Sequence, residues 1–185
     1  MCRHTGSMVG NRLLKLGILA PIALTLLATP PARADNLVLT ANQQLRYGSF
    51  AVPGTGSRTV SATGLVTDSG VLPVSGPTGP AQFTLAFDRG GGSNPVTLVI
   101  QVLLGSVGPV SQGGVTGALS AFTTDLPGVP LLVPGQAAIL SLPGCATRIC
   151  TRSFRVGARL DVTRASGGAA LTIPLPVSAT VLAVL

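Results

Sequence analysis

Residues able to do chemistry are scarce once the first 34 positions are set aside. The remaining chain has no His, Lys or Glu, and its charged side chains are eight Arg and five Asp. Most general bases and nucleophiles are therefore missing. Two Asp could serve a glycosidase, but the four later aspartates lie beside turn or strand-end residues, where Asp normally caps or is solvated. They are Asp68, Asp88, Asp125 and Asp161. We expect no enzyme, no catalytic residue and no cofactor.

The segment 88–94 combines oxygen ligands with glycine. Asp88, Ser93 and Asn94, with backbone carbonyls, offer the hard donors that calcium prefers. One carboxylate is too few for a tight site, and glycine runs are typical of turns. No Lys follows the glycines and no helix begins after them, so the segment lacks the phosphate-loop pattern. We expect a turn without a metal.

Cys145 and Cys150 are the two cysteines that follow the first 34 residues. An even count in an exported chain indicates a disulfide. The spacing differs from the Cys-x-x-Cys redox motif, and neither His nor Lys is present to lower a thiol pKa. We expect a structural bridge whose short ring contributes about 2 kcal/mol.

Five of the eight later arginines gather towards the C-terminal end, at positions 148, 152, 155, 159 and 164. One interpretation is a weak patch for an acidic surface polymer, formed by Arg152, Arg155 and Arg159. The alternative is a solvated strand face that limits aggregation at a sheet edge, with Asp161 partly neutralising Arg159.

Residues 1–34 have the order of a secretory signal peptide. Arg3, Arg12 and Lys15 precede an apolar run at 17–28, and Ala32-Arg33-Ala34 forms a cleavage site. We expect cleavage after Ala34 and export to the periplasm, cell surface or medium. An uncleaved membrane anchor is the alternative. Eight Arg against five Asp leave a net charge of +3 after cleavage, so nucleic acid is not an expected partner, nor is stable membrane insertion.

The elements that position these residues are strands, because apolar residues alternate with period two between Gly, Pro and Ser clusters. We expect one domain, 35–185, with an antiparallel two-sheet β-sandwich of eight to ten strands and no significant helix. Alternation changes phase at Gly48, which indicates a β-bulge. Prolines 127, 130 and 134 indicate an extended loop. The expected strands include 58–63, 71–74, 83–88, 96–104, 115–123, 137–142, 154–162 and 171–185.

Three connections follow from this pattern. The glycine-rich turn 89–95 predicts a hairpin between the strands on either side of it. The segment 165–168 predicts a second hairpin turn. The alternation from Leu171 to Leu185 predicts one very long final strand, with Pro174 and Pro176 on its other face at an edge or bend.

Three motifs between residues 41 and 104 resemble those of a known bacterial family. They are Leu-Arg-Tyr-Gly-Ser-Phe at 45–50, Gly-Thr-Gly-Ser-Arg-Thr-Val at 54–60 and Gly-Pro-Ala-Gln-Phe-Thr-Leu at 79–85. They are similar to the L-x-F-G, G-x-x-T-V and A-x-F-x-V patterns of exported proteins labelled Domain of Unknown Function 4402, with Tyr47 at the aromatic position. The resemblance implies a small periplasmic or surface β-sandwich of pilin-like character and no established activity.

These observations together predict a structural or adhesive exported protein. A fimbrial-type subunit would use a terminal strand, 35–40 or 171–185, to complete a neighbour's sheet. Expected partners are the protein itself or other surface proteins. The alternatives are a monomeric periplasmic binding module, which the lack of Trp does not favour, and a small outer-membrane β-barrel, which the six aromatic residues do not favour.

Overall fold

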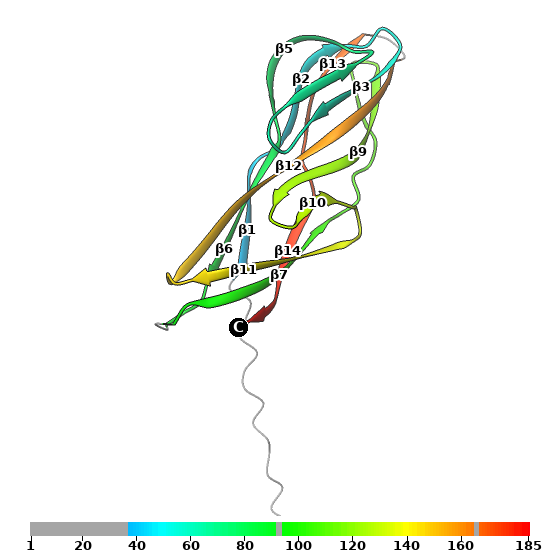
Figure 1. Cartoon of the computed structure of the whole chain (residues 1–185). Helices are drawn as coiled ribbons and strands as arrows, with labels where there is room; N and C mark the ends of the chain where they lie inside the picture. Colours follow the sequence, from blue (N-terminus) through cyan, green and yellow to red (C-terminus); the bar gives the residue numbers. More distant parts are fainter. Residues whose placement is uncertain (1–36, 92–93, 165–166) are drawn as a thin grey trace, which may run out of the picture. The chain divides into compact units, whose positions relative to one another are not determined.

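The computed structural model describes residues 37–91, 94–164 and 167–185 (Figure 1). These residues form strands, turns and extended connections, so the all-β expectation is confirmed. No helix within these ranges has the length and apolar character that a membrane crossing needs. The expected signal peptide lies outside the described residues.

The largest sheet is antiparallel and is organised around β12 (Ile149–Arg164), a strand of 16 residues. Along one edge, β12 pairs first with β6 and then with β3, and its C-terminal half pairs with β9 along the other edge. The remaining members of this sheet are β1 (Leu37–Gln43), β3 (Thr55–Val60), β4 (Val66–Ser69), β6 (Ala81–Asp88), β8 (Val110–Gln112), β9 (Val115–Leu126) and β10 (Val129–Leu132).

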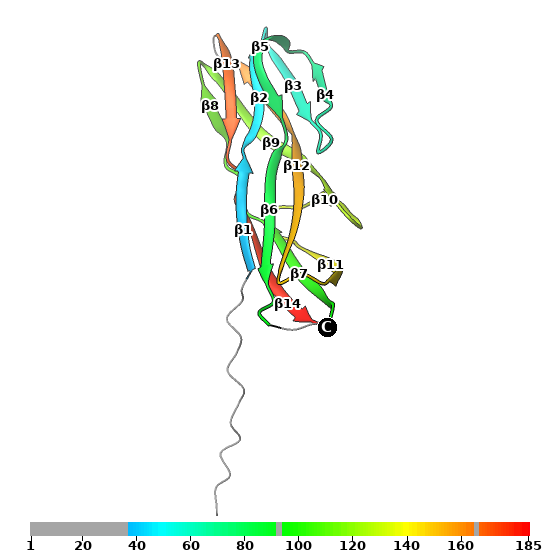
Figure 2. The ribbon, with the colours of Figure 1, turned by 90° about the vertical axis from the view of Figure 1, so that its left-hand side faces the viewer.

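Two smaller antiparallel sheets of three strands pack on this large sheet. In both views they lie near opposite ends of β12 (Figures 1 and 2). One has the order β11 (Ala137–Cys145), β7 (Val96–Leu104), β14 (Val177–Val184). The other has the order β13 (Gly168–Ile173), β2 (Leu45–Ala51), β5 (Leu72–Gly79). A single buried cluster contains side chains from all three sheets. The domain is therefore the expected sandwich, in which the large sheet forms one layer and the two small sheets together form the other.

Alternation predicts the buried faces well. Phe83, Leu85 and Phe87 of β6 are buried, and so are Leu98 and Ile100 of β7. The hairpin expected between these two strands is wrong, however, because β6 pairs with β1 and β12 while β7 pairs with β11 and β14. Both strands bury one face, but they do so from opposite layers of the sandwich. Alternation with period two determines which side chains of a strand face the core, but it does not determine which strand lies beside it in the sheet.

The long final strand and the second hairpin also need correction. The segment 171–185 is divided at Pro174–Pro176 into the end of β13 and β14, which belong to different small sheets. Proline cannot continue a ladder as a hydrogen-bond donor, so the chain leaves one sheet here and enters the next. β13 pairs with β2 and not with β12, so the hairpin expected across 165–168 is wrong. Residues 165–166 themselves lie outside the described part.

The bulge expected at Gly48 is confirmed. Gly48 has a φ of 63°, and the register with β13 shifts between Leu171 and Thr172 at this point. The described residues form 14 strands, more than the eight to ten expected. One of the additional strands is β10, which contains Pro130 in a region expected to be loop. It pairs only with β9, so its proline lies in a strand at the sheet edge.

Candidate functional site

A cleft of about 620 Å³ lies between the large sheet and the β11-β7-β14 sheet. The larger part of its wall is apolar, because the inward positions of facing strands meet there: Leu85 and Phe87 from β6, and Leu98 and Ile100 from β7. The segment between β11 and β12 closes one end. Other lining residues include Leu37, Leu142, Pro143, Cys145, Ile149, Cys150 and Arg152.

One edge of β12 next to this cleft has no strand beside it in the described residues. β6 occupies the opposite edge from Ile149 to Val156, while β9 joins β12 only from Val156 onwards. The carbonyl of Arg148 accepts a hydrogen bond from the Arg89 N–H on the β6 side. Successive residues of a strand direct their backbone groups to opposite edges. The N–H and C=O groups of Thr151 and Ser153 therefore point away from β6, towards the open edge.

Asp125 marks the point where this open edge begins. The β9 strand pairs with β12 as far as Thr124, and the next residue places a carboxylate oxygen 2.6 Å from the backbone nitrogen of Arg155. The Arg155 N–H thus donates to a side chain where a strand carbonyl would otherwise be. The chain then turns into β10, which pairs back on β9. The edge from Ile149 to Ser153, which we call the β12 free edge, remains available for pairing.

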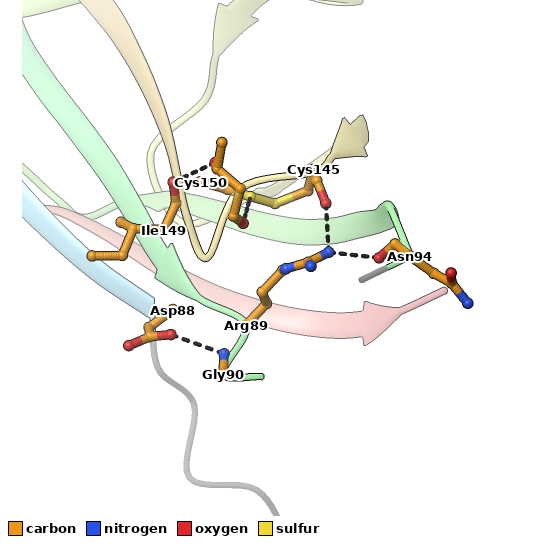
Figure 3. Close-up of a disulfide and its surroundings, with 8 residues drawn as sticks. Asp88, Arg89, Gly90, Asn94, Cys145, Ile149 and Cys150 are labelled. Atoms are coloured by element: carbon orange, nitrogen blue, oxygen red, sulfur yellow. Dashed lines mark hydrogen bonds between the residues drawn. A yellow bond between two sulfur atoms is a disulfide. The ribbon is translucent and has the colours of Figure 1, made fainter. Parts of the chain in front are cut away.

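A disulfide closes the loop between β11 and β12 (Figure 3), and both of its cysteines line the cleft. Cys145 ends β11 and Cys150 lies at the second position of β12, with their Cα atoms 5.8 Å apart. The Arg89 guanidinium reaches this loop and donates to the carbonyl of Cys145 over 3.1 Å and to the carbonyl of Asn94. The expected bridge is thus present, and it links the last residue of β11 in one layer to the start of β12 in the other.

Asp88 is used by the turn that was considered for calcium. Its Oδ1 accepts the Gly90 N–H over 2.8 Å, and its Oδ2 lies 3.3 Å from Nη2 of Arg148. These contacts, the Gly90 hydrogen bond first, lower the pKa of Asp88 below its usual value of 3.8. Ser93 lies outside the described residues, and within them no three acidic, His or Cys side chains gather as metal ligands. In the structure this carboxylate stabilises the turn after β6, through the Gly90 N–H and the Arg148 side chain.

The arginines proposed as one patch are divided between two faces. Arg155 and Arg159 share the outer face of β12, where Arg159 Nε lies 2.7 Å from an Asp161 carboxylate oxygen. Arg152 has the opposite phase and lines the cleft. The pKa of Asp161 is lowered by the hydrogen bond from Ser120 and, less strongly, by Arg159. Only two of the three predicted patch residues therefore lie together.

Arg58 was not among the expected site residues, and it is 5% exposed. Its Nε lies 3.4 Å from Asp68, and its guanidinium carbon lies 5.7 Å from the centre of the Phe50 ring. The signal was its phase, because Arg58 lies two residues before the inward-facing Val60 and therefore shares its face of β3. A half-buried pair against an aromatic face stabilises the packing of β3 on β2 and offers no group for turnover.

A family model matches residues 37–179 of the chain, and its description is "Domain of unknown function (DUF4402)". The chain belongs to the DUF4402 family. The match includes all three motifs that carry the resemblance and extends through the cysteine loop and β12 into the first residues of β14. No curated protein and no solved structure matches this DUF4402 chain.

Proposed function

We propose that this DUF4402 protein is an exported structural or adhesive β-sandwich that acts at the cell surface or in the periplasm through contacts with other protein chains, without turnover. One observation carries the proposal: the β12 free edge lies beside an apolar cleft. An exposed strand edge supplies backbone hydrogen bonds to an added strand, and a neighbouring pocket supplies burial for its side chains.

Export is supported by the sequence. The order of basic residues, apolar run and Ala-x-Ala site favours secretion, and a bridge between Cys145 and Cys150 fits an oxidising compartment. The charged side chains of the described domain are engaged mainly with one another or with backbone groups. Charged groups held in this way stabilise the domain, which fits a protein that acts through contacts with other protein chains.

A fimbrial-type subunit is the more specific form of the proposal. Both candidate donor strands pair within their own chain: β1 with β6, and β14 with β7, where Leu185 and Thr97 exchange backbone hydrogen bonds. Burial does not distinguish the two strands, because neither β1 nor β14 contains a fully buried residue. Strand exchange through β1 would release it from one molecule and place it against another.

The test is light scattering after size-exclusion chromatography, with negative-stain microscopy, on protein from native periplasmic and surface-shear extracts. Polymers or a ladder of masses would support the fimbrial form of the proposal. Deleting residues 35–40 should abolish them if this segment is the donor, and unchanged polymers would rule that segment out. A uniform monomer of ~15 kDa, at roughly 100 Da per residue in so Gly- and Ala-rich a chain, would overturn self-assembly.

A monomeric binding module is the second candidate, and the size of the cleft favours it. Its volume of about 620 Å³ falls within the usual range for small-molecule sites. A saccharide array would test the carbohydrate form of this function. Tyr47, the single tyrosine, is fully buried and offers no stacking platform, so we expect no hits.

A further inference from the structure

We infer that the β12 free edge and its cleft bind an extended, acidic segment of a different protein by β-strand addition. This inference rests on the proposed function, for which it names the partner chemistry. It follows from three features of the described residues: the direction of the backbone groups, the apolar wall beneath them, and the charge around them.

The backbone supplies the first feature. Thr151 and Ser153 direct their N–H and C=O groups to the open edge, since the Arg89-to-Arg148 and Arg155-to-Asp125 hydrogen bonds fix the phase of the strand. An added strand can continue the ladder that β9 leaves at Thr124. Pairing would begin next to Asp125 and run towards the disulfide loop.

The cleft supplies the second feature. Every other side chain of a strand added here would face the inward side of β12, towards Leu85, Leu98 and Ile100. Apolar residues at alternate positions would thus be removed from water. The intervening residues would face outward, on the side of Arg155.

Charge supplies the third feature and selects an acidic partner. Arg152 lies at the cleft and Arg155 on the outer face, and both side chains are exposed. Within the described part of the chain, Arg152 has no acidic partner. The nearby carboxylates are already engaged, Asp88 with Arg148 and Asp125 with the Arg155 N–H. Acidic residues in an added strand would meet an uncompensated positive field.

The same charge disfavours a second copy as the occupant. Pairing two β12 free edges would bring Arg152 and Arg155 of each copy next to those of the other, and like charges across strands are destabilising. The chain is also a poor source of acidic strands, because it contains five Asp and no Glu. The basic edge therefore limits self-pairing and leaves an acidic segment as the fitting ligand.

The test uses a fluorescently labelled peptide in which Val alternates with Asp, titrated with the folded domain and followed by anisotropy. We expect binding that weakens with salt. Ser153→Pro removes one N–H from the edge and should weaken binding about tenfold or more, while the matched Ser153→Ala keeps that N–H and should bind as the parent does.

Arg152→Gln should weaken binding roughly threefold to fivefold. Arg164→Gln, at the far end of β12, should have no effect.

Further peptides keep the test decisive if Ser153→Pro does not fold. A Val/Asp peptide with N-methylated backbone should fail to bind, and a Val/Lys peptide should bind at least about fivefold more weakly. Equal binding of the N-methylated peptide would overturn strand addition, and equal binding of the Val/Lys peptide would overturn the acidic partner. Tighter binding of the chain's own segment 35–41 would identify a second copy as the occupant. Polymers in native extracts together with no peptide binding would overturn this inference and leave the proposed function standing.

Discussion

At the scale of single residues, Tyr47 has the strongest constraint. It is fully buried, and its hydroxyl donates to the carbonyl of Ala158 over 2.9 Å, which ties β2 to β12 across the core. Burial, with a smaller contribution from Asp161, raises the pKa of Tyr47 above its usual value of 10.0. The folded state therefore favours the neutral phenol.

A prediction follows for alkaline pH. Because the folded pKa is raised, the stabilisation from this group is complete below pH 10.0 and is lost as the pH rises towards the folded pKa. Tyr47 is the single tyrosine, so phenolate absorbance reports on it alone. In urea it should ionise near pH 10, and in the native domain only on unfolding. Tyr47→Phe should lower the free energy of unfolding by about 1 to 2 kcal/mol. Phenolate formation near pH 10 in fully folded protein would contradict this account.

At the scale of elements, β12 depends on one glycine where three strands approach closely. A Cβ at Gly157 would lie 2.6 Å from the backbone nitrogen of Ala62, and the register with β9 shifts between Gly157 and Arg159. The N-terminal end of β12 depends on the cysteine loop, which connects it to β11. The strand is therefore fixed at its middle and at its N-terminal end, and its free edge lies between these two points.

The disulfide gives the prediction at this scale. The double variant Cys145→Ala, Cys150→Ala should lose about 2 kcal/mol or less of unfolding free energy in urea, because the ring closed by the bridge is short. The cleft should become more dynamic, so hydrogen exchange should increase in 144–153 and stay unchanged in β2. Unaltered exchange around the loop would show that the bridge does not hold this end of the cleft.

At the scale of the whole domain, the three sheets share one buried cluster. The large sheet contributes Phe83 and Phe154, whose rings stack with centroids 5.3 Å apart, and each small sheet contributes its own inward face. Neither small sheet has another layer among the described residues on which to bury that face. The sheets should therefore unfold together.

Cooperative unfolding is the corresponding prediction. Far-ultraviolet circular dichroism, which reports the strands, and the near-ultraviolet signal of Tyr47 should change at the same urea concentration. A core truncation in the smaller β11-β7-β14 sheet, Ile100→Ala, should shift both signals together and cost about 2 to 5 kcal/mol. Separate transitions would show that the ends of the sandwich are independent units.

The sequence by itself determined the class of fold, the inward residues of β6, β7 and β12, and the bulge at Gly48. These are local properties: alternation with period two indicates which side chains need burial, and a glycine at a phase change permits the left-handed backbone that the bulge adopts. The cysteine pair was likewise predictable from its count and spacing. The buried faces were thus largely readable before any partner strand was known.

Only the tertiary structure decided which strands are neighbours and what lies between them. The assignment of β6 and β7 to facing layers, the division of 171–185 between two sheets and the open edge at Thr151 and Ser153 all depend on contacts between distant residues. Alternation is the same whether or not a strand has a neighbour. The position of Arg152 at the cleft followed from its phase only once the inner face of β12 had been placed against β7.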